Sequence, residues 1–169
     1  ALARKIQQKL YKGKHIGGVD VTGDPSGLHR STTSEDGVNN FTIIKETFGT
    51  GILHPKVKLL KKQPPQVTRC EFVNELFEGY NGWEIQIDIR CRKLTEDLIY
   101  QLKNEDGTKS KAKQRDPKTS VKYEKYGHLS DCLDYLVCYY LRDTWYKFKG
   151  GGESVSLHST PAQYNGFNY

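Results

Sequence analysis

The sequence lacks several features that would place it in a membrane, secreted or zinc-binding class. No apolar run approaches the roughly 18 residues that a membrane-spanning helix needs, and we expect no membrane partner. The N-terminal stretch ALARKIQQKLYKGKH is charged throughout, unlike a signal peptide. There is no methionine, so we interpret the chain as processed or trimmed. The cysteines form no C-x-x-C pair, which argues against a zinc site.

Two further absences concern nucleotide hydrolysis and thiol chemistry. No Walker A pattern G-x-x-x-x-G-K-[ST] occurs, so the chain carries no ATPase signature. Cys70, Cys91, Cys132 and Cys138 stand among apolar or helical residues. We predict four buried free thiols in a reducing cytosol. Cys132 lies four residues after His128, but its position on the predicted core side favours inert packing over nucleophilic catalysis.

What the chain does have is a positive charge and enough apolar residues for a core. Its 169 residues are 36% hydrophobic and 11% aromatic, which suits one domain of ordinary size. The net charge is +6. This excess suits a polyanionic partner such as nucleic acid, and it is equally common in plain basic proteins, so composition leaves both open.

Helical and alternating patterns follow one another along the chain. Because strands alternate with helices, we predict an α/β fold with a largely parallel sheet in residues 1–149. Thr95 is the expected cap of the fourth helix. Residues 150–169 are Gly/Ser-rich and are predicted to be a tail. The expected elements are helices over 3–11, 38–51, 67–82, 93–104 and 128–142, strands over 19–22, 57–60 and 83–89, and a lysine-rich loop or hairpin over 104–126.

Asp24 lies where the first strand ends in a Gly-Asp-Pro-Ser-Gly turn. Ligands of open α/β sheets bind at the carboxyl ends of strands, so this is a good ligand position. Asp in such a turn also commonly bonds its own backbone. Asp20, within the same strand, is costly there unless it is paired or metal-bound, or else it marks an exposed edge. The sequence leaves these alternatives open.

The stretch YGHLSDCLDYLVCYYL predicts an amphipathic helix with acids in its first turns. The helix dipole alone explains Asp134. For Asp131 we favour a ligand role, because His128 falls on the same side and Gly127 leaves room for a ligand. Together with Asp24 it would hold Mg²⁺ or Mn²⁺. The predicted core stripe is Leu129, Leu133, Leu136, Val137 and Tyr140.

The lysine-rich run over 109–125 is suited to bind the phosphates of a DNA backbone. A solvated loop is the simpler interpretation of such a run. Paired metal ions held by carboxylates split phosphodiesters by activating water and stabilising the leaving oxygen. Acids and lysines together therefore favour a nuclease.

Several motifs in order resemble the C-terminal nuclease domain of a tailed-bacteriophage terminase large subunit. They are VDVTGDPSGLHRST, then PPQVTRCEFVNELF with Arg69, Val73 and Asn74, and then YGHLSDCLDYL with its H-x-S-D motif. The resemblance extends from the first residues to about residue 141. It implies an RNase H-like mixed sheet flanked by helices.

The resemblance also implies an activity and a set of residues. Such domains are metal-dependent endonucleases that cut concatemeric double-stranded DNA during viral genome packaging, with two Mg²⁺ or Mn²⁺ ions. Asp24 would be the second acid and Asp131 the third, with His128 near the metals and Asp20 a less favoured ligand. The expected DNA-binding residues are Arg30, Lys109, Lys111, Lys113, Arg115 and Lys118.

One departure from the family is that no segment here matches its first, acid-bearing strand. We therefore expect an N-terminally incomplete domain, completed by a missing N-terminal part and by the ATPase domain, in the same or a separate chain. The other implied partners are the portal and the small terminase subunit, in the host bacterial cytoplasm and transiently at the procapsid portal. The alternatives are a non-catalytic DNA- or portal-binding fragment of the same fold, and another RNase H-like nuclease of resolvase or transposase type.

Overall fold

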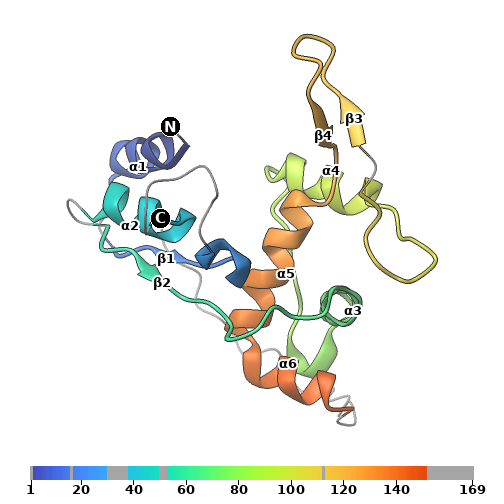
Figure 1. The fold of residues 1–169 in the computed structure, drawn as a ribbon. Helices are drawn as coiled ribbons and strands as arrows, with labels where there is room; N and C mark the ends of the chain where they lie inside the picture. The colour runs from blue at the N-terminus through green and yellow to red at the C-terminus, as the bar shows by residue number, and fades with distance from the viewer. Residues whose placement is uncertain (1, 16, 30–37, 50–52, 112, 152–169) are drawn as a thin grey trace. The chain divides into compact units, whose positions relative to one another are not determined.

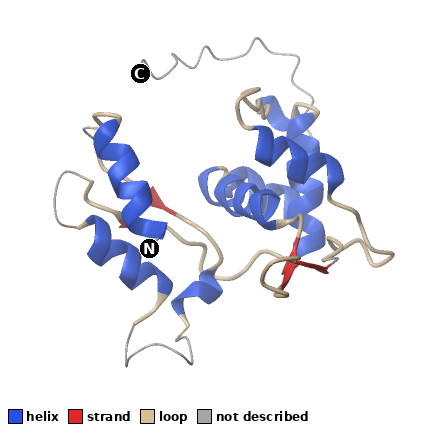
Figure 2. Ribbon diagram, turned by 90° about the horizontal axis from the view of Figure 1, so that it is seen from above, coloured by secondary structure: helices blue, strands red, loops and turns tan. Residues whose placement is uncertain are grey.

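The protein has a mixed α and β fold in which helices predominate. The computed structural model describes residues 2–15, 17–29, 38–49, 53–111 and 113–151 (Figure 1). The chain divides into two compact units. The first unit comprises Ala1–Pro64 with Tyr135–Tyr140, and the second comprises Pro65–Asp134 with Leu141–Tyr169. In the described residues the strands are confined to short pairs (Figure 2).

The first unit contains one short parallel strand pair. Asp20 pairs with Lys56 and Val21 with Val57. The Lys58 N–H also donates to the carbonyl of Val21 at 2.8 Å, which lengthens the pairing by one residue. The predicted strands at these two places are therefore confirmed, although both are shorter than expected. The elements of this unit are α1 (Leu2–Lys12), β1 (Asp20–Val21), the 3-10 helix η1 (Pro25–Leu28), α2 (Asn40–Phe48) and β2 (Lys56–Val57).

The core of the first unit forms around α2. The side chain of Asn39 begins this helix by accepting a hydrogen bond from the Thr42 N–H at 3.0 Å. Phe41 is buried and its ring lies against η1, where a Cβ on Gly27 would come within 2.9 Å of it. Only glycine permits this close approach. The buried apolar residues of this unit's N-terminal part are Phe41, Phe48, Leu53 and Leu60.

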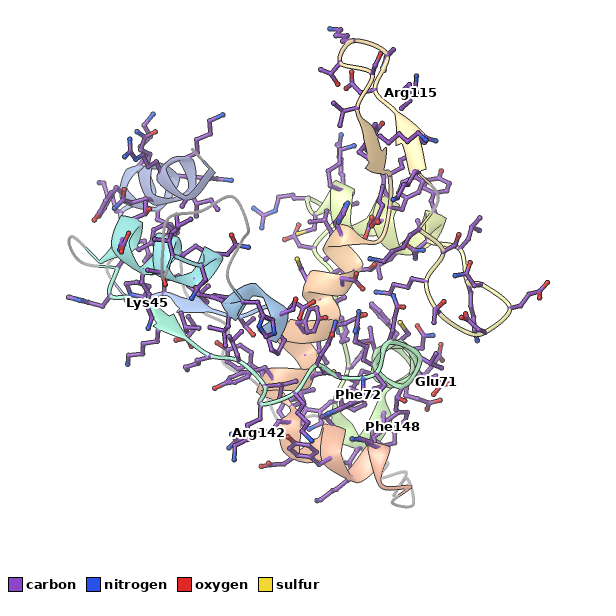
Figure 3. The ribbon with its side chains drawn as sticks, viewed as in Figure 1. Lys45, Glu71, Phe72, Arg115, Arg142 and Phe148 are labelled. Atoms are coloured by element: carbon purple, nitrogen blue, oxygen red, sulfur yellow. The ribbon has the colours of Figure 1, made fainter. Side chains whose placement is uncertain are left out.

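The second unit has an aromatic core between its helices. Phe72 is fully buried, and its ring centroid lies 5.5 Å from that of Trp145 and 5.2 Å from that of Phe148. Figure 3 shows Phe72 and Phe148 together between α3 and α6. The elements of this unit are α3 (Gln66–Phe77), the 3-10 helix η2 (Tyr80–Gly82), α4 (Arg92–Tyr100), β3 (Lys113–Arg115), β4 (Lys122–Glu124), the first half of α5 (His128–Tyr140) and α6 (Arg142–Lys149).

A basic hairpin occupies the lysine-rich segment, for which the sequence predicts either a loop or a hairpin. Strands β3 and β4 pair antiparallel, with Lys113 opposite Glu124 and Arg115 opposite Lys122. The carboxylate of Asp116 closes the turn by accepting bonds from two backbone N–H groups. Within the second unit the hairpin projects beyond α4 and α5 (Figure 1).

The predicted strand over 83–89 is wrong. All seven residues are described, and none of them pairs with a strand in the part of the chain that the structure describes. The alternation is typical of a strand, but a strand also needs a neighbour. The largely parallel sheet is likewise wrong for the described residues, whose only parallel strand pair is β1–β2.

Two helix predictions also need correction. Thr95 lies inside α4, which begins at Arg92, and its hydroxyl donates to the carbonyl of Cys91. Helix α6 was not predicted, although Leu141, Trp145 and Phe148 have helical spacing. Residues 152–169 of the predicted tail lie outside the described residues.

The predicted core stripe of α5 is largely wrong. Leu129 and Leu136 remain 42% and 43% exposed, and Tyr140 is 51% exposed. The helix instead buries a face that carries the polar residues Ser130 and Asp134. These residues form hydrogen bonds with Asp97 on α4 and Arg69 on α3. The buried residues of α5 are Ser130, Asp134, Tyr135, Val137 and Cys138.

Candidate functional site

The start of α5 is fixed by a carboxylate from α4. Asp97 is 5% exposed, and it accepts hydrogen bonds from the backbone N–H groups of Gly127 and Ser130, each at 2.7 Å. An acid at a helix N-terminus satisfies N–H groups that have no partner within the helix. Asp97 therefore positions the first turn of α5, which carries Asp131.

Gly127 precedes this helix in a backbone conformation that favours glycine, with φ of 103°. A Cβ at this position would lie 2.6 Å from the side-chain oxygen of Gln101. The space at Gly127 is thus taken by Gln101. This corrects the expectation that Gly127 leaves room for a ligand.

Two basic side chains hold the acids of α5. Arg69 on α3 donates to Asp131 at 2.9 Å and to Asp134 at 3.2 Å. Lys109 donates to Asp134 at 2.6 Å, to Asp131 at 3.2 Å and to the hydroxyl of Ser130 at 3.1 Å. Two formal positive charges thus face two carboxylates. We call Arg69, Lys109, Asp131 and Asp134 the ionic cluster.

The two carboxyls of the ionic cluster have opposite pKa shifts. Burial raises the pKa of Asp134 above its ordinary value, and the nearby charges of Lys109 and Arg69 only partly oppose it. Burial also disfavours the charged form of Asp131, but the hydrogen bond from Arg69 and the charge of Lys109 outweigh it. The pKa of Asp131 is therefore below its ordinary value. Asp131 is thus the carboxylate of the pair that stays ionised most readily.

A cavity of about 160 Å³ adjoins the ionic cluster. Asp134, Lys109 and Cys70 line it together with apolar side chains of α3 and α4. The Cys70 thiol lies 3.8 Å from the carboxylate of Asp134. Burial, and then the negative charge of Asp134, raise the pKa of Cys70 to about 11. Cys70 is therefore a thiol at neutral pH and a poor nucleophile.

The predicted burial of all four cysteines is wrong. Cys138 is buried and Cys70 is half-buried, but Cys91 and Cys132 are exposed. Cys132 is exposed because the buried face of α5 passes through Ser130 and Asp134 instead.

Asp24 is at the end of the strand region in the first unit. Its carboxylate accepts a hydrogen bond from the Ser26 N–H at 2.8 Å and another from the side-chain amide of Gln63 at 3.1 Å. The first of these is the turn-forming role that the sequence left open. Asp24 belongs to the first unit and Asp131 to the second. Their approach to metal-bridging range, on the order of 4–7 Å, stays a prediction.

Asp20 already has two partners in the first unit. Its Oδ2 accepts a hydrogen bond from Lys58 at 2.6 Å and one from the hydroxyl of Tyr140 at 2.7 Å. The bond from Lys58, followed by the bond from Tyr140, lowers the pKa of Asp20. Of the alternatives open for Asp20, the structure shows a paired carboxylate at an exposed position.

The predicted DNA-binding residues are not equivalent in the structure. Lys113, Arg115 and Lys118 are exposed on the hairpin, and Arg115 is labelled in Figure 3. Lys109 is held in the ionic cluster with its side chain only 11% exposed. Arg30 lies outside the described residues. His128, the first residue of α5, is exposed.

Lys111 connects the hairpin to the ionic cluster. Its ammonium lies 3.5 Å from Glu124 on β4 and 4.0 Å from Oδ2 of Asp131. Asp131 thus has Oδ1 bound by Arg69 and Lys109, while Oδ2 is turned toward the base of the hairpin. The basic element and the candidate acid are neighbours within one unit.

Sequence reasoning missed the roles of Arg69, Lys109 and Asp97. The burial of Arg69 could have been predicted from the sequence, since Arg69 stands between Val67 and Phe72 on a helix with apolar neighbours. Asp97 and Lys109 had no such signal, because their partners are 21 or more residues away along the chain. Such partners emerge only from the packing of α3, α4 and α5.

Comparison with known proteins adds no family to these observations. No family model, curated protein or solved structure matches this chain. Among the described residues, no three His, Cys, Asp or Glu side chains gather in a way that could hold a metal ion. In the same part of the chain, no helix has both the length and the apolar character needed to cross a membrane.

Proposed function

We propose that this chain is a divalent-metal-dependent DNA endonuclease module of the type found in viral DNA-packaging terminases, with an RNase H-like fold. One observation carries the proposal. Asp131, whose pKa is lowered and whose side chain is 20% exposed, turns Oδ2 toward Lys111 at the base of the basic hairpin. Metal-dependent phosphodiester hydrolysis needs carboxylates that stay ionised, and a basic hairpin beside them is suited to hold the DNA backbone.

The donor chemistry fits a hard cation. Mg²⁺ and Mn²⁺ prefer carboxylate oxygens, and Oδ2 of Asp131 has only the 4.0 Å contact with Lys111 among the interactions described. The Asp24 carboxylate keeps lone pairs beyond its bonds to Ser26 and Gln63. When bound, the metal would activate the attacking water and stabilise the leaving oxygen. Two acids suit one ion with waters, and a second ion needs a further acid.

The chain's own residues would bind and orient the substrate. The exposed cations of the hairpin would contact successive phosphates and fix the path of the duplex. Lys111 would draw one phosphate toward Asp131, while Arg69 and Lys109 keep the Asp131 side chain in place through Oδ1. The proposed partners remain double-stranded DNA, the ATPase part of the packaging motor, the portal and the small terminase subunit.

A second candidate function is a non-catalytic DNA- or portal-binding module. It is favoured by the ionic cluster itself, in which the charges of Arg69 and Lys109 balance those of Asp131 and Asp134. In that case the acids are structural, and the hairpin alone supplies the function.

Plasmid nicking in Mn²⁺ separates the two candidates. The nuclease proposal predicts nicking that is lost, roughly 10²-fold or more, in both Asp131→Asn and Asp24→Asn. The matched control is Asp106→Asn, an exposed aspartate that caps its own turn at Thr108. DNA binding measured in parallel should persist in all three variants. Binding without any Mn²⁺- or Mg²⁺-dependent nicking by the wild-type chain would favour the non-catalytic function.

A further inference from the structure

The connection between η2 and α4 has the sequence of a strand but pairs with no strand among the described residues. In residues 83–88, Trp83, Ile85 and Ile87 alternate with Glu84, Gln86 and Asp88. All six residues are described, and Figure 1 draws them as a plain trace from η2 to α4. Trp83 has extended backbone angles and is 43% exposed.

Two backbone N–H groups of this segment are bound within the second unit. The N–H of Trp83 donates to Tyr80 at 3.0 Å, and the N–H of Ile85 donates to Leu76 at 3.2 Å. Glu84 and Gln86, both exposed, make no backbone hydrogen bond within the described part of the chain. In an extended chain successive N–H groups point to opposite sides. If the extended geometry of Trp83 continues along the segment, the N–H groups of Glu84 and Gln86 lie on one free edge.

We propose that this edge pairs with the same edge of a second copy of the chain, antiparallel and centred on Ile85. In that register Trp83 lies opposite Ile87, and Ile85 lies opposite its own counterpart. Glu84 lies opposite Gln86, and these two residues exchange the backbone bonds that each lacks. Aromatic and β-branched residues across a strand pair stabilise it.

The neighbouring symmetric registers are disfavoured by charge. Centring the pair on Glu84 places this carboxylate against itself. Centring it on Gln86 places Glu84 opposite Asp88. Like charges directly opposite each other destabilise a strand pair, so Ile85 is the centre that avoids facing acids.

An apolar groove beside the segment would receive the partner's tryptophan. The groove has a volume of about 920 Å³ and is lined by Ile87, Phe77, Leu98 and Ile99 among others. Because Trp83 of one copy faces Ile87 of the other, its indole would reach this groove. Burial of an aromatic anchor in a partner's pocket is the usual source of affinity in an interface, and a short strand pair alone would be marginal.

Cysteine cross-linking tests the register. Ile85→Cys, in a background of Cys91→Ser and Cys132→Ser, should form an intermolecular disulfide under mild oxidation. A non-hydrogen-bonded antiparallel pair places its Cα atoms about 4.5 Å apart, within the range of a disulfide. The matched control is Ile87→Cys, whose opposite residue is Trp83 rather than itself. Equal cross-linking at both positions would overturn the proposed register.

Analytical ultracentrifugation tests the dimer itself. The wild type should show concentration-dependent dimerisation that Trp83→Ala weakens roughly tenfold or more. Gln86→Pro should abolish dimerisation, because proline removes the free N–H without touching the internal bonds of Trp83 and Ile85. Gln86→Ala should keep dimerisation, and circular dichroism would confirm that each variant is folded. A wild type that stays monomeric, or that only captures an extended peptide from another protein, would overturn the proposal.

Discussion

Asp97 on α4 accepts a 2.7 Å hydrogen bond from the backbone N–H of Ser130, 33 residues later in the sequence. With the matching bond from Gly127, it joins α4 to the first turn of α5. Asp131 follows Ser130 directly, so its orientation depends on a carboxylate that none of the motifs singled out in the sequence includes.

Replacing Asp97 by alanine should strongly destabilise the second unit. The change leaves two N–H groups at the start of α5 without their charged acceptor, and hydrogen bonds to charged groups contribute about 1.5–3 kcal/mol each. We expect a loss of roughly 2–5 kcal/mol in the free energy of unfolding, measured by urea denaturation. Glu105→Ala, at an exposed position of a turn, is the control and should change it by less than about 0.5 kcal/mol. Equal effects of the two changes would contradict the capping role.

Arg69 and Asp134 should show strong coupling in a double-mutant cycle. Their side chains are 4% and 2% exposed, so removing one partner leaves a buried, poorly compensated charge. Arg69→Met alone should cost about 3–5 kcal/mol. Arg69→Met combined with Asp134→Leu should cost clearly less than the sum of the two single changes, because both buried charges are gone. Additive effects would show that the pair does not interact in solution.

The stability difference between the wild type and Asp131→Asn should depend on pH. The pKa of Asp131 is lower in the folded chain than in the unfolded chain. Its stabilising contribution is therefore fully present above the unfolded value of about 3.9 and is lost as the pH falls through the folded value. We expect the wild type to be more stable at neutral pH and the difference to shrink in acid, measured by denaturation at several pH values. A difference that stays constant into acid would contradict the shift.

Thiol labelling should separate the cysteines into two classes. Cys91 and Cys132 are exposed, whereas Cys138 is buried and the pKa of Cys70 is raised to about 11. A thiol reagent at mildly alkaline pH should therefore modify Cys91 and Cys132 in the native protein and the other two only after unfolding. Mass spectrometry of the labelled peptides identifies the sites. Early labelling of Cys138 would show that the core near α5 opens readily.

The exposed cations of the hairpin should control the salt dependence of DNA binding. Replacing Lys113, Arg115 and Lys118 by alanine should flatten the plot of log affinity against log salt by roughly 0.9 for each phosphate that the variant no longer binds. The control is the removal of three exposed lysines from α1, namely Lys5, Lys9 and Lys12. An equal decrease in slope for both variants would assign DNA binding to overall charge and not to the hairpin.

Local sequence patterns predicted the individual elements better than their pairing. Helix α2 and the hairpin follow from nearby residues, such as the Asn39 cap and the turn at Asp116. The segment over 83–89 alternates like a strand, but the pattern could not reveal that no described residue pairs with it. Secondary structure of this kind depends on a distant neighbour.

The candidate site was predictable only in part. The position of Asp131 in the first turn of α5 follows from helical periodicity and is confirmed. Its partners Arg69 and Lys109 come from other elements, so no local pattern could identify them. The rotation of α5 that buries Asp134 and exposes Leu129 results from these partners. Apolar spacing alone therefore chose the wrong face.

The ionic cluster constrains how this sequence can change over generations. Loss of Arg69 alone leaves two acids facing one lysine, and loss of Asp134 alone leaves an excess of positive charge in a buried site. Either single step costs stability of about 3–5 kcal/mol, a large fraction of what a small protein has. Homologous chains are therefore expected to keep all four residues or to replace a base and an acid together. A distant relative that motif searches overlook could therefore be recognised by a joint replacement of the base at position 69 and the acid at position 134.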